Sequence, residues 1–206
     1  MRVLKLAAVG LMAVFLAGCG INNIPTYDQA MKAKWGEVEN QYQRRADLVP
    51  NLVETVKGYA TQEKDVLVQV TEARAKATSI QLSPDIINNP EEFKKYQAAQ
   101  GELSQALGKL LSITENYPDL KSNQNFLALQ SQLEGTENRI AVARKDYIAA
   151  VQTYNTELVT LPGSLWASMY YGNRFKPAES FTAAAGSDQA PKVNFGTDKA
   201  TSGSGG

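Results

Sequence analysis

The stretch from Trp35 to Tyr59, WGEVENQYQRRADLVPNLVETVKGY, decides how the rest of the chain is interpreted. Its apolar residues recur every three or four positions, which predicts helix on both sides of Pro50. Inside a helix a proline removes the hydrogen bond to the carbonyl of Ala46, at a cost of about 3 kcal/mol. Either Asp47 caps a new helix that holds Pro50 in its first turn, or one long helix kinks at Pro50.

The spacing of apolar residues continues beyond this stretch with a seven-residue period. One series runs from position 35 to 77 and another from 38 to 80, and only Glu63 and Arg45 interrupt them. Such a repeat predicts helices packed side by side at shallow angles. The unbroken phase favours a single kinked helix from Asp28 to Thr78, with a cap at Thr26 or Asp28 and a length of roughly 76 Å.

The rest of the body also has the pattern of helices. The expected segments are a loop over 79–90, a helix over 91–115, a turn at Tyr117-Pro118-Asp119, and a long helix capped by Ser122 or Asn123 and ending at Leu161-Pro162-Gly163. No segment alternates apolar and polar residues as a strand does. The sequence therefore predicts one all-α domain over residues 27–182.

The composition excludes most catalytic devices. Lysine plus arginine and aspartate plus glutamate both number 21, so no charge bias points to nucleic acid. The chain has no histidine and one cysteine, which excludes Ser-His-Asp triads, imidazole ligands and thiolate zinc sites. The enzyme alternative is a carboxylate pair from Glu37, Glu39, Glu54 and Glu63, but a narrow bundle rarely forms the cleft that acid–base chemistry needs. We expect no enzyme, cofactor or metal site.

The N-terminus has the pattern of a secretory leader. Arg2 and Lys5 flank the start of an apolar run over 6–16, which is shorter than the roughly 20 residues of a membrane-spanning helix. The run ends in Leu16-Ala17-Gly18-Cys19, which resembles the bacterial lipobox.

This resemblance implies a signal peptide over 1–18, acyl chains on Cys19, and a lipidated spacer over 19–26 that leads into the domain. Gly20 after the cysteine favours the periplasmic face of the outer membrane, if the organism has two membranes. The alternative is an ordinary secretory signal in which Cys19 is incidental.

The C-terminal part divides into an aromatic segment and a tail. The segment over 164–181 holds Trp166, Met169, Tyr170, Tyr171, Phe175 and Phe181. It is either a short helix and loop that cap the end of the bundle, or an exposed surface for docking or membrane contact. Residues 183–206 are rich in alanine, glycine and serine, which predicts a flexible tail.

Several motifs, in order, resemble the LemA family. They are Arg44-Arg45-Ala46-Asp47-Leu48-Val49-Pro50-Asn51-Leu52-Val53, Pro118-Asp119-Leu120-Lys121-Ser122-Asn123, Thr136-Glu137-Asn138-Arg139-Ile140, Phe175-Lys176-Pro177 and Pro191-Lys192-Val193-Asn194-Phe195. The resemblance implies an elongated antiparallel bundle of three to four long helices at the cell envelope, with no established enzymatic activity. Relatives are associated with envelope proteases and membrane remodelling. Many members carry a transmembrane helix, whereas this chain offers a lipobox.

Two groups of polar residues remain as candidate sites. They are Arg44, Arg45, Asp47, Pro50 and Asn51 in the first stretch, and Glu137, Asn138 and Arg139 in the last long helix. Either they pair across helices and fix the register, or they form a polar surface for a partner. We predict a lipid-anchored, non-catalytic scaffold or adaptor that contacts another envelope protein, by resemblance a membrane protease. The alternative is a membrane-active module that binds or remodels lipid through 164–181.

Overall fold

The computed structural model describes residues 20–80, 86–172 and 174–182. Every regular element in these ranges is a helix, so the predicted all-α class is confirmed for the described part of the chain. Of the helices described, none combines the length and the apolar character needed to cross a bilayer. Cys19, the leader and the predicted tail lie outside the described residues.

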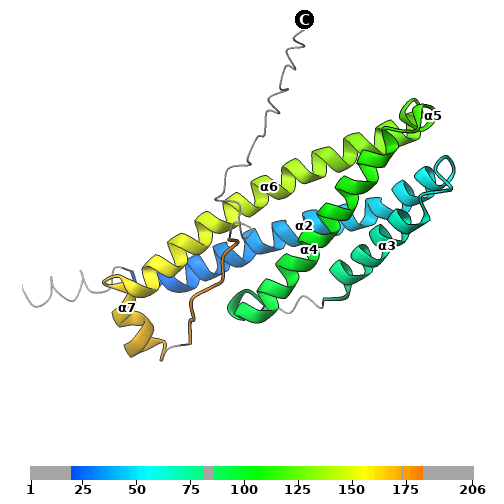
Figure 1. The fold of residues 1–206 in the computed structure, drawn as a ribbon. Coiled ribbons are helices and arrows are strands. Elements are labelled where there is room, and N and C mark those ends of the chain that lie inside the picture. Colours follow the sequence, from blue (N-terminus) through cyan, green and yellow to red (C-terminus); the bar gives the residue numbers. More distant parts are fainter. Residues whose placement is uncertain (1–19, 81–85, 173, 183–206) are drawn as a thin grey trace, which may run out of the picture.

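The helices differ greatly in length (Figure 1). They are α2 (Asn23–Lys57), α3 (Lys64–Ser79), the 3-10 turn η1 (Ile86–Asn88), α4 (Pro90–Thr114), α5 (Pro118–Lys121), α6 (Gln124–Val159), α7 (Gly163–Leu165) and the π-helical turn η2 (Trp166–Tyr170).

The two longest helices, α2 and α6, run antiparallel along each other (Figure 1). At one end Asn23 Nδ2 donates to Glu157 Oε1 at 3.2 Å, and at the other Asn123 Nδ2 donates to Tyr59 Oη at 2.8 Å. With 35 residues in α2, the pair is about 52 Å long. The body is therefore a rod built on one antiparallel pair.

The shorter helices α3 and α4 form an antiparallel hairpin that covers part of this pair (Figure 1). Lys76 on α3 contacts Glu102 on α4 at 2.7 Å, and Lys109 donates to Gln69 at 3.0 Å. Because the residue numbers rise on one helix as they fall on the other, these contacts fix opposite directions.

The single helix expected from 28 to 78 is wrong. Helix α2 ends at Lys57, and the chain reverses through a turn over 58–63, in which the amide of Ala60 donates to the carbonyl of Val56. The apolar period continues across the turn because α3 buries its own stripe against α2 and α4. Periodicity reports which residues are buried; it does not report whether the helix is continuous.

The helix starts agree with the sequence in part. Asn123 caps α6 as predicted, since its side chain accepts from the amide of Phe126 at 3.0 Å. Helix α4 begins one residue before the expected start, with Pro90 in its first position. The expected turn at 117–119 opens the short helix α5, and α2 begins at Asn23, so the caps predicted at Thr26 and Asp28 are wrong.

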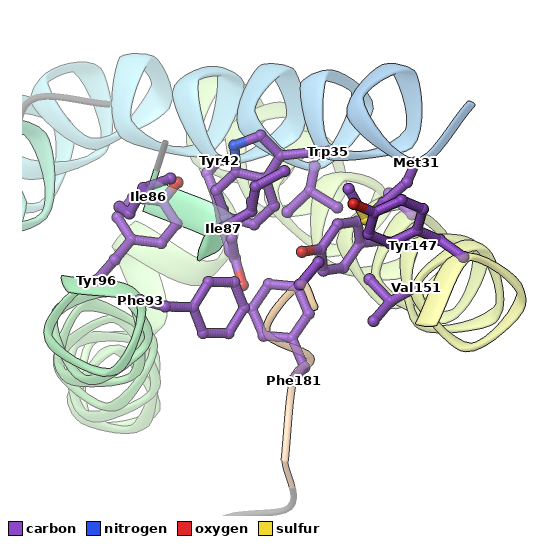
Figure 2. Packing of buried hydrophobic residues seen from close by; sticks show 14 of the residues in the cluster. Met31, Trp35, Tyr42, Ile86, Ile87, Phe93, Tyr96, Tyr147, Val151 and Phe181 are labelled. Atoms are coloured by element: carbon purple, nitrogen blue, oxygen red, sulfur yellow. The ribbon is translucent and has the colours of Figure 1, made fainter. Parts of the chain in front are cut away.

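The buried apolar residues form two clusters along the rod. Figure 2 shows the aromatic cluster, in which Trp35 lies 5.6 Å from Phe93 and 5.2 Å from Tyr147 between ring centroids. Phe181, from the segment after η2, completes it at 5.1 Å from Phe93. The second cluster is mainly aliphatic and is built mostly from α2, α3, α4 and α6, with Val49, Leu52, Val70, Leu103, Leu110 and Leu133 among its members.

Candidate functional site

Arg45 lies between the two clusters and is only 1% exposed. Its Nη1 donates to Glu137 Oε1 at 3.0 Å and to Ser104 Oγ at 2.6 Å. Its Nη2 donates to the backbone carbonyl of Gln100 at 3.1 Å and to the side-chain oxygen at 2.6 Å. The guanidinium also stacks 5.0 Å from the ring centroid of Tyr42. One buried cation thus links α2, α4 and α6.

These contacts form a polar layer across the bundle, which we define as Arg45, Gln100, Ser104 and Glu137. Gln100 extends it to the fourth helix, because its amide nitrogen donates to the carbonyl of Ala77 on α3 at 3.4 Å. The side chain of Glu137 is 40% exposed, so one edge of the layer meets water. A buried charge is costly unless it is paired and hydrogen-bonded, and here Arg45 has both kinds of partner.

Sequence reasoning singled out Arg45 and Glu137 but missed Gln100 and Ser104. A usable signal was present: Gln100 occupies a position of the apolar stripe of α4, four residues after Tyr96 and three before Leu103. A polar residue in the middle of such a stripe indicates a partner across the core.

Pro50 lies inside α2, and the helix continues through it. Because Pro50 has no amide hydrogen, the carbonyl of Ala46 has no donor within the helix. Arg74 from α3 supplies one, with its Nε 2.8 Å from that oxygen. Neither a capped break nor a free carbonyl occurs, and Asp47 instead accepts a side-chain bond from Gln43 at 2.7 Å.

The other predicted residues of these motifs lie apart from the layer. Arg44, Asp47 and Asn51 are exposed on α2. Asn138 and Arg139 are exposed on α6, where Arg139 Nε donates to the side chain of Gln41 at 3.2 Å. This second contact joins α2 to α6 on another side of α6 from the layer.

Two grooves border these groups. One, of about 700 Å³, lies along α4 and α6 and is lined by Arg45, Glu137, Lys94 and Arg144 among others. The other, of about 350 Å³, is lined by residues of α2 and α6 that include Asn138 and Arg139. Within the described ranges, no cluster of acidic, histidine or cysteine side chains could hold a metal ion.

The carboxylates of the smaller groove are engaged by a lysine. Lys34 Nζ lies 3.2 Å from Glu37 and 3.5 Å from Asp146. The hydrogen bond and charge of Glu37, and then Asp146, raise the pKa of Lys34. Such a cluster is a charged surface that links two helices.

The segment after η2 is fixed to the bundle through its backbone. Tyr147 donates to the carbonyl of Glu179 at 2.7 Å, and Tyr154 donates to that of Lys176 at 3.0 Å. Asn155 bonds both the carbonyl and the amide of Ala178 at 2.9 Å. Burial raises the pKa of Tyr154 to about 12 and raises that of Tyr147 as well.

The aromatic segment is partly buried, as the end-cap interpretation predicts, and partly exposed. Phe181 is buried, and Trp166 and Phe175 pack partly buried against the aromatic cluster, as an end cap does. By contrast Met169 is 81% exposed and Tyr170 is 66% exposed. The segment therefore has an inner side that packs on the bundle and an outer side that does not.

The described chain starts at this same end of the rod. Tyr171 Oη donates to the carbonyl of Ile21 at 2.9 Å. A methyl group built on Gly20 would lie 3.3 Å from Pro162, which follows the last turn of α6. Gly20 and Ile21, the first described residues, therefore lie at the α7 end of the bundle.

Comparisons with known proteins give a consistent answer. The sequence model of the LemA family matches residues 34–195. "Magnetosome protein MamQ 2" of Paramagnetospirillum magneticum is 28% identical over 176 residues, which cover 78% of this chain and 64% of that protein. "Magnetosome protein MamQ" of Magnetospirillum gryphiswaldense is 26% identical over 174 residues, covering 77% and 62%. "Protein LemA" of Metamycoplasma hominis is 25% identical over 117 residues, covering 57% and 49%. The chain thus spans less than two thirds of the length of these relatives.

Proposed function

The chain belongs to the LemA family, and we propose that it is a non-catalytic helical scaffold or adaptor held at the bacterial cell envelope by lipid on Cys19. The observation that supports this most is the long antiparallel α2–α6 pair, which hydrogen bonds join at both ends. Its contacts run from Asn23–Glu157 at the Cys19 end to Asn123–Tyr59 at the other. Such a rod holds a partner site at a fixed distance from an anchor.

The state of the carboxylates supports a non-catalytic role. In the larger groove Glu137 is paired with Arg45 and Glu102 with Lys76. General acid–base catalysis needs carboxyl groups that are free to exchange protons with a bound substrate. Carboxylates that each hold a cation from another helix serve the packing of the bundle.

We place the partner, an envelope protein such as a membrane protease, at the end far from Cys19. A groove of about 550 Å³ opens there between α2 and α3, lined by Val53, Leu67 and Val68 with lysines and glutamates around them. Val68 is 53% exposed within it. An apolar floor with a charged rim is the usual composition of a protein–protein contact.

Two measurements test this function. Labelled palmitate should enter the wild-type chain and not Cys19→Ala, and the labelled protein should fractionate with the outer membrane. An unlabelled wild-type chain would refute the anchor.

For the partner, affinity capture from envelope extracts should recover a specific protein with the wild type and with Gln62→Glu, an exposed control in the nearby turn. Recovery should fall with Val68→Glu. Equal recovery with both variants would place the partner elsewhere.

A membrane-remodelling module is the second candidate, favoured by the exposure of Met169 and Tyr170. It predicts that the protein deforms or permeabilises vesicles, and that Met169→Ser abolishes this effect. Trp166 and Phe175 are poor test positions because they pack against the bundle core. Vesicles that keep their shape and contents would favour the scaffold.

A further inference from the structure

Exposed apolar side chains are concentrated at one end of the rod. Ten large hydrophobic residues are exposed in the described ranges, and five of them fall within residues 159–170. The three most exposed are in this group: Met169 at 81%, Leu161 at 74% and Val159 at 73%. Single exposed hydrophobics are normal on a soluble protein, but five of them within twelve consecutive residues make this end of the rod a candidate interaction surface. We call Val159, Leu161, Leu165, Met169 and Tyr170 the apolar cap.

The apolar cap lies where the N-terminal part of the chain joins the body. Tyr171, next to Tyr170, holds the carbonyl of Ile21, and Pro162, next to Leu161, lies against Gly20. Nineteen residues precede Gly20, and they include the apolar run over 6–16 and the lipobox cysteine. Whatever holds this N-terminus in a membrane therefore meets the body beside the apolar cap.

The chemistry of the surroundings also suits a lipid surface. Tyr170 packs edge-on against Tyr171 at 4.9 Å between centroids, so aromatic rings with polar tips border the aliphatic residues. Such amphipathic rings favour the boundary between headgroups and acyl chains. The exposed Arg174, whose amide donates to the carbonyl of Tyr171, adds a cation that attracts anionic headgroups.

We infer that the apolar cap inserts into the surface of the bilayer that holds the N-terminus, so that the α2–α6 pair stands away from the membrane. This inference rests on the proposed attachment at Cys19 and adds a second contact to it. Several acyl chains on Cys19 would by themselves hold the protein firmly at the membrane. The second contact orients the rod, which a flexible tether alone does not.

The geometry makes the orientation measurable. Apolar faces at membrane surfaces sink about 5–10 Å into the boundary region. The turn between α2 and α3, which contains Thr61, lies about 52 Å away along the rod. A quencher carried by lipid should reach one end only.

The test uses the full lipidated chain in vesicles of phosphatidylethanolamine and phosphatidylglycerol that contain spin-labelled lipid. Cys19 is the only cysteine and is blocked by its lipid, so an introduced cysteine takes a fluorophore selectively. The label is placed at Ser168→Cys, an exposed position within η2, and at Thr61→Cys as the control. We expect strong quenching at Ser168→Cys and none at Thr61→Cys.

Adding Leu161→Ser and Met169→Ser to the Ser168→Cys chain should remove most of that quenching. Equal quenching at the two labels means that the rod lies flat, and no quenching at Ser168→Cys means that the apolar cap does not contact lipid; either result overturns the inference. Quenching that persists after the serine substitutions would also overturn the inference, because the N-terminal tether alone would then bring the label to the lipid. Mass spectrometry of the N-terminal peptide separates the two proposals. If Cys19 carries no acyl group, the lipid anchor is wrong, and quenching at Ser168→Cys in a Cys19→Ala background, where only the introduced cysteine takes the fluorophore, leaves the apolar cap.

Discussion

Replacing Pro50 should reduce the contribution of Arg74 to the free energy of unfolding. The carbonyl of Ala46 has no donor within the helix, because Pro50 has no amide hydrogen. Arg74 Nε donates to it at 2.8 Å instead. Pro50→Ala restores an amide hydrogen at the position from which a helix normally serves that carbonyl. Either donor is enough to satisfy this carbonyl, so the effects of removing the two donors on stability should not add.

The magnitudes follow from the burial of the acceptor. Ala46 is 2% exposed, and a buried carbonyl left without a donor costs about 1–3 kcal/mol. Arg74→Ala should therefore lower the free energy of unfolding by about 1–3 kcal/mol in the wild type. In the Pro50→Ala background the new amide serves Ala46, and the same substitution should cost under about 1 kcal/mol. The coupling energy should be about 1–2 kcal/mol.

The assay is a double-mutant cycle measured by urea unfolding with far-ultraviolet circular dichroism, on chains that begin at residue 20. Lys76→Ala is the matched control, because Lys76 lies on the same helix and pairs with Glu102 at the surface. Its cost should be equal in the two backgrounds. If Arg74→Ala costs the same with proline and with alanine at position 50, Arg74 does not replace the missing helical donor and our reasoning is wrong.

Three further predictions concern other parts of the fold. Arg45→Ala should lower the free energy of unfolding by about 3–5 kcal/mol, because it leaves a cavity and removes the donor from two oxygens of the buried Gln100. The change of its exposed neighbour, Arg44→Ala, should stay within about 0.5 kcal/mol, and similar values for the two in urea unfolding would contradict the buried layer. Burial raises the pKa of Tyr154 in the folded protein to about 12, so the unfolded chain loses this proton first. The free energy of unfolding should therefore fall as the pH rises from about 10 toward 12. In Tyr154→Phe this fall should be shallower, and an unchanged slope would show that Tyr154 does not cause it. Gly163→Ala should lower the melting temperature because a methyl group there would collide with a backbone carbonyl of α6, whereas Gly36→Ala meets open space and should raise it slightly; equal shifts would refute the close contact.

The helical class, the two ends of α4, the start of α6 and the buried faces could be predicted from the sequence. Burial repeats along a helix with a fixed period, and caps such as Asn123 act within a few residues of themselves. The turn after Lys57 escaped prediction because the apolar period of α3 continues that of α2. A local pattern carries no information on whether two buried stripes belong to one helix or to two.

The partners of the polar residues could not be predicted for a similar reason. Arg45 was visible as the residue that interrupts an apolar stripe, yet its neighbours Gln100 and Ser104 lie on a helix that is distant in sequence. Arg74 gave no signal, because its importance arises only from a carbonyl that Pro50 leaves free on another helix. Contacts between helices depend on their relative register, which no single helix encodes.

The polar layer influences the alignment of α6 along α2. Apolar stripes repeat every turn, so sliding α6 along α2 by one turn, about 5.4 Å, would still bury apolar side chains against one another. A slide that brings Ile140 into the place of Glu137 would leave Arg45, a cation that is 1% exposed, without its carboxylate partner, whereas the opposite slide would bring Glu134 toward it. An unpaired buried charge costs several kcal/mol, which is more than imperfect apolar packing of one turn would cost. The layer therefore disfavours sliding in one direction, and the contacts of Asn23 with Glu157 and of Asn123 with Tyr59 at the two ends of the rod would be lost in both directions.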